Sequence, residues 1–468
     1  MSPIVTRASF IKGGLAAVAL PSFAGTQEKP ELKVGVISDI HLTRSKVRAE
    51  RICLPALEWF RDQGVDAVVC TGDLATTGML AELELLSYVW YKTFPDDKLP
   101  DGRHVEKVFL YGNHDTSPDV EIYSIREGRQ DEFKRASVLT DRAKAWETCF
   151  HEKFEPIYTK RVKGYAFVAA HWNGLKESVP GAPEYLRAHA ADLAGDKPFF
   201  YCQHAPLLGT VNPLLGHFDD GAVTEVLKGF PNAIAFTGHS HASLTDETSI
   251  WQGAFTAVCG SCCAGSGMRY MKPWFENSDV PGTLDVPYKK RTDSQMPILN
   301  IFNGGQGMLV EVFKDRVVFH RKSFVYNEPN GADWVVPLPA GKSRPYEIDA
   351  RREASSSPEF SPGAKIEVAE RDGANRAKVP MRQLVVSFPA ADRGDRPFGY
   401  EVTVASSEAG VEPVVRCVLS PDFHLPPTRR VKSAECVFAL DGLPPAGLRR
   451  ISVRAFNSFR RYGKAICA

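Results

Sequence analysis

The sequence lacks any apolar run that approaches the roughly 20 residues needed by a membrane-spanning helix. It also lacks an excess of either charge, since 57 Lys and Arg residues face 56 Asp and Glu residues for a formal net charge of +1. This balance gives no electrostatic reason to expect the whole chain to bind nucleic acid or an anionic membrane. No internal repeat is present. Function must therefore be read from particular sites.

The cysteines lack the spacing of a four-cysteine zinc site. The segment "CGSCC", Cys259 to Cys263, contains one C-x-x-C, and no second C-x-x-C completes it. A redox or metal role for this segment is therefore the less favoured interpretation. Cys70 and Cys202 lie inside apolar strand-like runs and are expected to be buried, inert thiols. A disulfide between Cys417 and Cys436, both in strand-like runs near the C-terminus, stays open.

The N-terminus has the anatomy of an export signal. Arg7 and Lys12 form a charged start, a short apolar run follows, and a small-residue exit, Ser22-Phe23-Ala24, comes last. We expect residues 1–24 to be a cleaved signal and the mature protein to be periplasmic or extracellular. The alternative is an amphipathic first helix of the mature fold. The stretch "TRASFIK" resembles a twin-arginine signal with Ala8 in place of the second arginine, so the export route stays open.

A chain of 468 residues is expected to form two domains. Strand-like runs alternate with helix-like stretches in the first half, which predicts an α/β domain with buried sheets. We place this domain at residues 30–338, with a loop-rich insertion at about 265–297. A linker rich in Pro, Ser and charge, 339–362, then leads to an all-β sandwich at 363–468.

The predicted β-sandwich ends in "RISVRAFNSFRRYGKAI", which resembles the closing strands of a fibronectin type III module. This part of the chain is mildly basic. A solvated basic face is the simpler explanation, and contact with a polyanionic glycan or a protein partner is the alternative.

Polar clusters end five of the predicted strands of the α/β domain. They are "SDIH", "TGD", "YGNHD", "CQH" and "TGHSH". Each has a structural interpretation when taken alone: Asp39, for example, could cap a helix, and Asp73 could form a turn. Ligands of α/β proteins nevertheless gather where strands end, so five such endings in succession predict one shared site.

The five blocks occur in the order found in the calcineurin-like metallophosphoesterase superfamily, which the chain resembles from about Glu31 to Phe324. The resemblance implies an α/β/β/α sandwich with a dinuclear metal centre. It implies seven ligands. One ion would be held by Asp39, His41 and His241, the other by Asn113, His204 and His239, with Asp73 bridging both.

Carboxylate, imidazole and amide donors suit Mn, Fe, Zn or Ni better than Ca. Two divalent or mixed-valence ions roughly 3.5 to 4 Å apart would share a water and lower its pKa, so that a metal-bridging hydroxide attacks phosphorus in line. We therefore expect a metal-dependent phosphatase or phosphodiesterase acting on a small-molecule or polymeric phosphate ester, without a covalent phosphoenzyme. Monoester and diester substrates both stay open.

His114 is left over once the ligands are assigned, and the resemblance places it near the leaving group. This predicts a general acid or an electrostatic partner of the developing oxyanion, oriented by Asp115. The alternative is a brace for its loop. Purple acid phosphatases have a metal-bound tyrosine where this chain has Thr76, and they lack the histidine that is present here as His41. A coloured Fe(III)-tyrosinate centre is therefore not expected.

Several further residues are weaker candidates for substrate contact, each with a simpler core or surface role. They are His171, His217, Arg269, Met271 to Phe275 and Tyr288 to Thr292. A competing function is a non-catalytic or weakly catalytic binding protein whose C-terminal sandwich recognises a glycan or protein. A nuclease is a third possibility, disfavoured because the catalytic part shows no basic groove signal.

Overall fold

The computed structural model describes residues 28–43, 46–116, 142–172, 178–213, 218–263, 305–340, 343–374, 380–423 and 425–468. The expected export signal and insertion lie outside these ranges, as do four of the candidate substrate contacts: His217, Arg269, Met271 to Phe275 and Tyr288 to Thr292. Among the described residues, no helix is both long enough and apolar enough to cross a membrane.

A seven-stranded mixed sheet forms the first half of the core, in the order β12-β11-β10-β1-β2-β3, with β13 paired to β11. The parallel strands β1, β2 and β3 lie at one side, and β10 joins β1 in antiparallel register. The strands are β1 (Leu32–Ile37), β2 (Ala67–Cys70), β3 (Glu106–Phe109), β10 (Gln306–Val312), β11 (Arg316–Ser323), β12 (Glu328–Pro329) and β13 (Trp334–Pro337).

A six-stranded sheet forms the second half, in the order β4-β5-β6-β7-β9-β8. Its four central strands are parallel, and an antiparallel strand closes each edge. The strands are β4 (Ile157–Val162), β5 (Tyr165–Ala170), β6 (Phe199–Cys202), β7 (Ala233–Thr237), β8 (Ile250–Gln252) and β9 (Thr256–Cys259).

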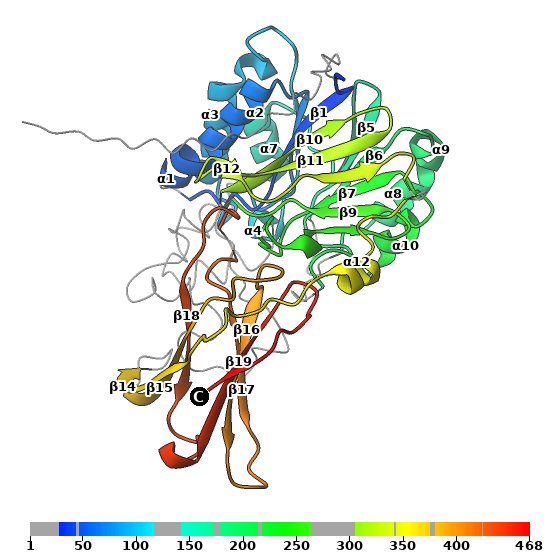
Figure 1. The fold of residues 1–468 in the computed structure, drawn as a ribbon. Coiled ribbons are helices and arrows are strands. Elements are labelled where there is room, and N and C mark those ends of the chain that lie inside the picture. The colour runs from blue at the N-terminus through cyan, green and yellow to red at the C-terminus, as the bar shows by residue number, and fades with distance from the viewer. Residues whose placement is uncertain are drawn as a thin grey trace, which may run out of the picture.

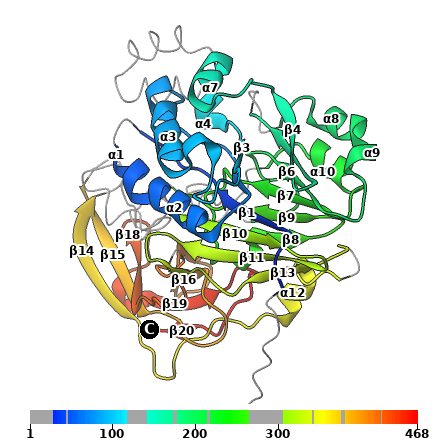
Figure 2. The ribbon, with the colours of Figure 1, turned by 90° about the horizontal axis from the view of Figure 1, so that it is seen from above.

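The two sheets pack face to face, and helices cover their outer faces (Figures 1 and 2). Val36 and Val69 of the first sheet share one buried cluster with Phe200 and Phe236 of the second. The first sheet is covered by α2 (Leu54–Gln63), α3 (Leu80–Thr93) and α7 (Arg142–Phe150), and the second by α8 (Ala182–Ala188) and α10 (Ala222–Leu227). This confirms the expected α/β/β/α layers.

Short helical segments complete this domain. A helix α1 (Lys46–Arg48) and a π-helical segment (Ala49–Cys53) lead into α2. The others are η2 (Pro95–Asp97), α4 (Asn113–Thr116), α9 (Ala190–Leu193) and η3 (Glu247–Ser249).

Two antiparallel sheets form the C-terminal region, below the first domain in Figure 1. One has the order β14-β15-β18 and the other β17-β16-β19-β20. Leu384 and Phe438 of the first sheet pack with Tyr400 and Val453 of the second, which confirms an all-β sandwich. The strands are β14 (Glu367–Ala374), β15 (Pro380–Pro389), β16 (Gly399–Ser406), β17 (Val414–Leu419), β18 (Ser433–Ala439), β19 (Arg449–Phe456) and β20 (Ile466–Cys467), with a short η5 (Ala446–Leu448).

The disulfide considered between Cys417 and Cys436 is not formed, since both thiols are free. Cys436 belongs to the core between the two C-terminal sheets, whereas Cys417 packs in a cluster shared with the first domain. Alternate residues of a strand face opposite sides, so a strand-like pattern alone does not show which face each cysteine occupies.

The segment predicted as a linker contains a helix, α12 (Ile348–Ala354). The Glu347 side chain caps it by accepting the amides of Asp349 and Ala350. From this helix, the Arg351 guanidinium reaches Glu247, 2.7 Å away. Part of the predicted linker is therefore fixed to the first domain.

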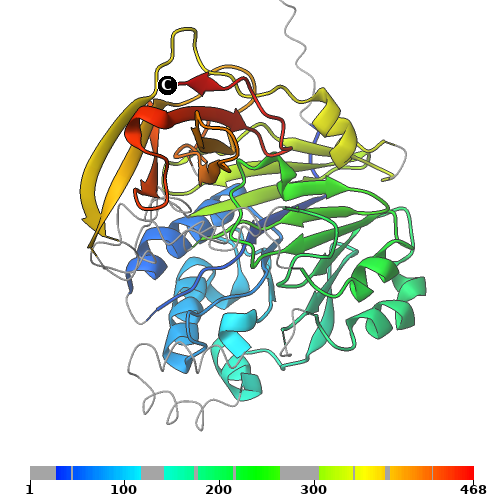
Figure 3. The same ribbon diagram turned by 90° about the horizontal axis from the view of Figure 1, so that it is seen from below.

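The C-terminal sandwich is joined to the first domain by a shared apolar cluster, and Figure 3 shows this side of the molecule from below. Phe398 and Phe423 of the sandwich belong to the same buried cluster as Ala242 and Phe255. The Thr245 hydroxyl also donates a hydrogen bond to the Phe423 carbonyl. Ala242 and Thr245 follow the "TGHSH" segment closely in the chain.

Glu247, in the chain segment after "TGHSH", contacts side chains from other elements of the fold. Its carboxylate contacts Arg321 of β11 at 2.8 Å and Arg351 at 2.7 Å, and accepts the Trp334 indole N–H at 3.3 Å. Burial opposes ionisation of Glu247, but the two guanidinium groups hold its pKa below the usual range.

We expect Glu247 to make the fold lose stability in acid. An acid whose pKa is lower in the folded than in the unfolded protein stabilises the fold above the unfolded pKa, about 4.3 for Glu. That stabilisation is lost as the pH falls through the folded pKa. Glu247→Gln should therefore lower the melting temperature at pH 7, and the difference from wild type should shrink towards pH 3. Thermal unfolding from pH 7 to pH 3 measures this difference in melting temperature, with the exposed Glu225→Gln as control. A difference that stays constant with pH would contradict the prediction.

Candidate metal centre

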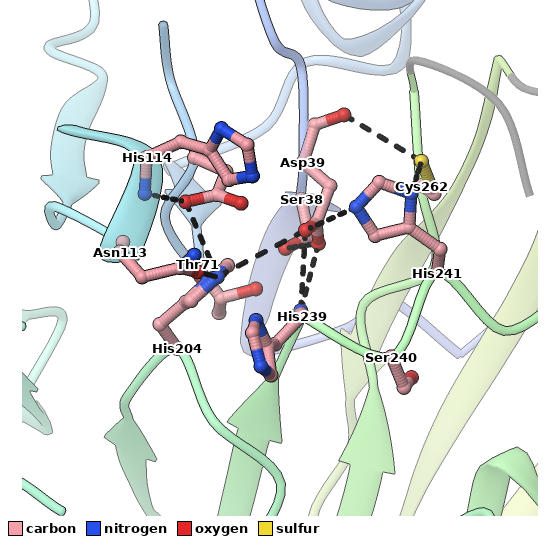
Figure 4. A network of polar contacts seen from close by, with 12 residues as sticks. Ser38, Asp39, Thr71, Asn113, His114, His204, His239, Ser240, His241 and Cys262 are labelled. Carbon is pink, nitrogen blue, oxygen red and sulfur yellow. Dashed lines mark hydrogen bonds and ion pairs between the residues drawn. The ribbon is translucent and has the colours of Figure 1, made fainter. Parts of the chain in front are cut away.

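The carboxyl ends of strands from both sheets meet at one place, and the seven predicted ligands all lie there. Figure 4 shows Asp39, Asn113, His204, His239 and His241 among them. Parallel strands deliver their following residues to the same edge of a sheet, which explains why segments distant in sequence converge. Asp39 and His41 follow β1, Asp73 follows β2 and Asn113 follows β3, whereas His204 follows β6, and His239 and His241 follow β7.

The donor atoms form two groups that share one member. In each group, the donor atoms lie within 4.8 Å of one another. Asp73 belongs to both, because its Oδ2 lies 3.3 Å from His41 Nε2 and its Oδ1 lies 3.3 Å from His204 Nε2. The groups are Asp39, His41, Asp73 and His241, and Asp73, His204 and His239.

Asn113 joins the second group through its amide. Its Oδ1 lies 3.0 Å from His204 Nε2. The His204 Nδ1 is 2.7 Å from the Thr71 carbonyl, which can only accept a hydrogen bond. Nδ1 therefore carries a proton, and Nε2 is the nitrogen that faces Asp73 and Asn113. An imidazole held in this way would bind a metal ion through Nε2.

The donor atoms of the first group lie equally close to one another. His41 Nε2 lies 3.0 Å from His241 Nε2, and His241 Nε2 lies 3.0 Å from Asp39 Oδ1. Asp39 is also fixed from behind, since Ser38 Oγ donates to its Oδ2 at 2.5 Å. Carboxylate and imidazole donors at this spacing, almost all buried, fit transition-metal ions such as Mn, Fe, Zn or Ni. The site residues therefore fit a pair of divalent cations.

Charge coupling inside the centre is strong. Burial raises the pKa of Asp73, but the surrounding imidazoles of His204, His114 and His41 hold it well below its usual range. Burial lowers the pKa of His204, but Asp73 and Asp39 raise it to about 9. The buried carboxylates thus attract positive charge, and a bound cation would displace protons from the imidazoles.

The backbone is strained at five of the seven predicted ligands. Their φ angles lie in the left-handed region, which non-glycine residues enter at a cost of order 1 to 3 kcal/mol each. Such strain persists only where the surrounding structure imposes it, and here the amides of Asp39 and His41 are held by the carbonyls of Gly72 and Asp73 at 3.0 and 2.8 Å. The angles are 50° at Asp39, 46° at His41, 50° at Asp73, 63° at His239 and 50° at His241.

Two glycines let the chain approach the carboxylates closely. A Cβ on Gly112 would lie 2.2 Å from Asp73 Oδ1. A Cβ on Gly238 would lie 2.0 Å from Ser38 Oγ and 2.6 Å from Asp39 Oδ2. The glycines of "GNHD" and "GHSH" therefore keep space beside the predicted ligands.

His114 lies at the edge of the centre, on α4. Its backbone amide donates to Asp73 Oδ1 at 2.9 Å, and its Nδ1 lies 2.9 Å from the Thr76 carbonyl. A carbonyl can only accept, so Nδ1 carries a proton. The ring stands edge-on to His41, with centroids 4.5 Å apart.

Asp115, which is expected to orient His114, lies between two loops of the centre. Its carboxylate accepts the backbone amides of Leu74, Ala75 and Gly112 at 3.1, 2.9 and 2.8 Å. Burial and the nearby charge of Asp73 raise its pKa to about 7. Asp115 thus fixes the two loops that carry Asp73 and Asn113, and the Thr76 carbonyl contacts the His114 ring.

His171 lies in the core. It is 1 % exposed, and its Nδ1 accepts the Tyr111 amide at 2.9 Å. Burial lowers its pKa to about 3. Its neighbour Trp172 lies nearer the centre, with its ring 5.7 Å from that of His239. His171 therefore has a role in the core, which was the simpler of its two interpretations.

Sequence reasoning missed Cys262. Its Sγ lies 3.3 Å from His241 Nδ1. A signal was present, because "AFTAVCGSCC" reads as another strand ended by polar residues, and β9 does lie beside β7. The thiols of Cys259, Cys262 and Cys263 are free and buried.

Residues 32–243 match the sequence model of a family described as calcineurin-like phosphoesterase, so the chain contains a calcineurin-like phosphoesterase domain. No curated protein matches the chain. Among solved structures, it is similar to a dimetal phosphatase from Danio rerio at 11 % identity and a TM-score of 0.39, covering 66 % of this chain and 99 % of that one.

Two other solved structures show comparable likeness. GAP50, the anchor in the inner membrane complex of Plasmodium, is 11 % identical with a TM-score of 0.37, covering 67 % of this chain and 90 % of that one. Vacuolar Protein Sorting 29 from Cryptosporidium parvum is 10 % identical with a TM-score of 0.30, covering 65 % of this chain and 97 % of that one.

Replacing Gly238 by Ala should disturb the first donor group, because the added Cβ would collide with Ser38 Oγ and Asp39 Oδ2. We expect the affinity for one of two Zn²⁺ or Mn²⁺ ions to fall by about 10- to 100-fold, as for other changes beside a ligand. Calorimetric titration measures this. The control is Gly195→Ala, whose Cβ meets nothing within 4 Å. Unchanged affinity in a folded Gly238→Ala protein would refute the packing argument.

Proposed function

We propose that the protein is an exported hydrolase that cleaves a phosphate mono- or diester with two divalent metal ions. The observation that carries this proposal is the position of Asp73, whose two oxygens face His41 after β1 of the first sheet and His204 after β6 of the second. An acidic group between two sets of imidazoles is what a pair of cations sharing one carboxylate requires.

When bound, the two cations would activate water and neutralise the charge that develops at phosphorus. We assign the first ion to Asp39, His41 and His241, and the second to Asn113, His204 and His239. The side chains of this chain fix the geometry, since the Ser38, Thr71 and Asp115 groups hold ligands or ligand loops in place. Water as nucleophile makes a covalent phosphoenzyme unnecessary.

The exposure of the site residues indicates where substrate enters. Asp39, Asp73 and His204 are each at most 1 % exposed. His114, His239 and His241 are partly exposed. Substrate would therefore approach from the side of these three histidines, with the phosphate over the centre and the leaving group at His114.

We also infer that the C-terminal sandwich is a fibronectin type III-like module. A three-stranded sheet packed on a four-stranded antiparallel sheet supports this class. Its firm attachment beside the "TGHSH" loop gives it a structural role, and its contact with a glycan or protein partner stays a hypothesis.

Asp73→Ala should abolish phosphoesterase activity, because both donor groups lose their shared carboxylate. The protein reconstituted with Mn²⁺ or Zn²⁺ should hydrolyse bis-p-nitrophenyl phosphate or p-nitrophenyl phosphate. The variant should lose more than about 100-fold, the upper end of what a ligand's outer partner costs. Steady-state rates measure this, with the exposed Asp192→Asn as control. Wild-type protein that binds two metals but cleaves neither ester would favour the binding-protein alternative.

His114→Ala should slow the reaction according to the leaving group. A general acid contributes about 10²- to 10⁴-fold when the leaving oxygen needs a proton. The loss in kcat should therefore be large for an alkyl phosphate and small for p-nitrophenyl esters, whose leaving group departs as a stable anion. The exposed His104→Ala is the control. An equal loss on both substrates would instead assign His114 to charge stabilisation or to bracing its loop.

A further inference from the structure

A buried thiol lies behind one of the predicted ligands. Cys262 follows β9 and is 1 % exposed. Its Sγ lies 3.3 Å from His241 Nδ1 and 3.6 Å from the main-chain carbonyl oxygen of Asp39 (Figure 4). The thiol thus contacts two residues of the same donor group, on the side away from the Nε2 of His241.

The segment that carries the thiol is fixed. The Cys263 amide donates to the Ser38 carbonyl at 3.0 Å, and the Ser261 hydroxyl donates to the Ala242 carbonyl at 3.2 Å. The Gly305 amide closes the other side by donating to the Cys263 carbonyl at 3.0 Å. The segment therefore joins the strand end that bears Asp39 to the loop that bears His241.

The donor and acceptor capacities of the contacting atoms predict the direction of both hydrogen bonds of the Cys262 thiol. The Asp39 carbonyl can only accept, so the S–H donates to it. The sulfur lone pair is then left to accept the proton on His241 Nδ1. With Nδ1 protonated, Nε2 is the nitrogen that would bind a metal ion, and it lies 3.0 Å from both Asp39 Oδ1 and His41 Nε2.

We propose that Cys262 is a positioning residue of the metal centre, which sets the tautomer and ring orientation of His241 while linking it to Asp39. This inference rests on the proposed function. The Thr71 carbonyl plays the same part for His204 at 2.7 Å. Sulfur is a weaker acceptor than a carbonyl oxygen, so His241 is held less tightly than His204.

The two metal sites should therefore respond differently to loss of the thiol. Cys262→Ala removes the acceptor, and we expect about a 10- to 100-fold loss of affinity for one divalent ion. The other ion, on the side of His204, should bind as in wild type. Cys262→Ser keeps a donor and an acceptor and should restore most of the affinity. The matched control is Cys263→Ala, whose thiol donates to the Gln306 carbonyl at 3.7 Å.

Titration of the metal-free full chain with Zn²⁺ measures both affinities, and ¹⁵N NMR of the Zn²⁺-loaded wild type identifies the His241 tautomer. We expect a proton on Nδ1. A proton on Nε2, or unchanged affinity in a folded Cys262→Ala protein, would overturn the inference. If that variant fails to fold, the wild-type NMR spectrum and the Ser variant decide.

Cobalt substitution separates positioning from direct ligation. A thiolate bound to Co²⁺ gives a charge-transfer band, whereas a thiol behind a histidine does not. We expect no such band, and a band that disappears in Cys262→Ser would overturn the positioning role. Wild-type protein that binds two ions in this assay supports the proposed function whatever the Cys262 variants show. Failure of the Cys262 inference can therefore be distinguished from failure of the proposed function.

Discussion

The shared carboxylate of Asp73 is the interaction on which the rest of the site depends. It lies between imidazoles that arrive from both sheets, and it is almost completely buried. A buried charge must be compensated, so His41 and His204 must stay close on either side of it. The packing of the two sheets sets that separation, because each sheet delivers its histidines from the ends of rigid parallel strands.

The backbone of the predicted ligands is strained, and the surrounding contacts hold it in that conformation. Five predicted ligands adopt left-handed backbone, and the loops that carry them are cross-linked by the Asp115 carboxylate and by main-chain hydrogen bonds. Gly112 and Gly238 remove the side chains that would separate these loops. The protein's own hydrogen bonds and packing therefore hold the donor atoms of the centre together.

The fold was predictable where the signal is local. Apolar runs ended by polar residues identify β1, β2, β3, β6 and β7, and the same endings supply the predicted ligands. Contacts between distant segments were not predictable. The pairing of Asp115 with the Leu74 amide and of Cys262 with His241 depends on how loops from different strands fold together. The helix α12 was missed because its cap, Glu347, stands in a stretch whose composition resembles a linker.

The loop after His241 connects the site to the C-terminal sandwich. Within a few residues it passes from a predicted ligand to Thr245, which bonds the Phe423 carbonyl, and to Glu247, which pairs with Arg321 and Arg351. The Cys262 thiol holds the start of this loop and the sandwich holds its middle. Because a strained residue keeps its conformation only when its neighbours are fixed, the left-handed backbone of His241 draws its stability from both contacts. The second domain is thereby part of the structure that presents this histidine to the centre.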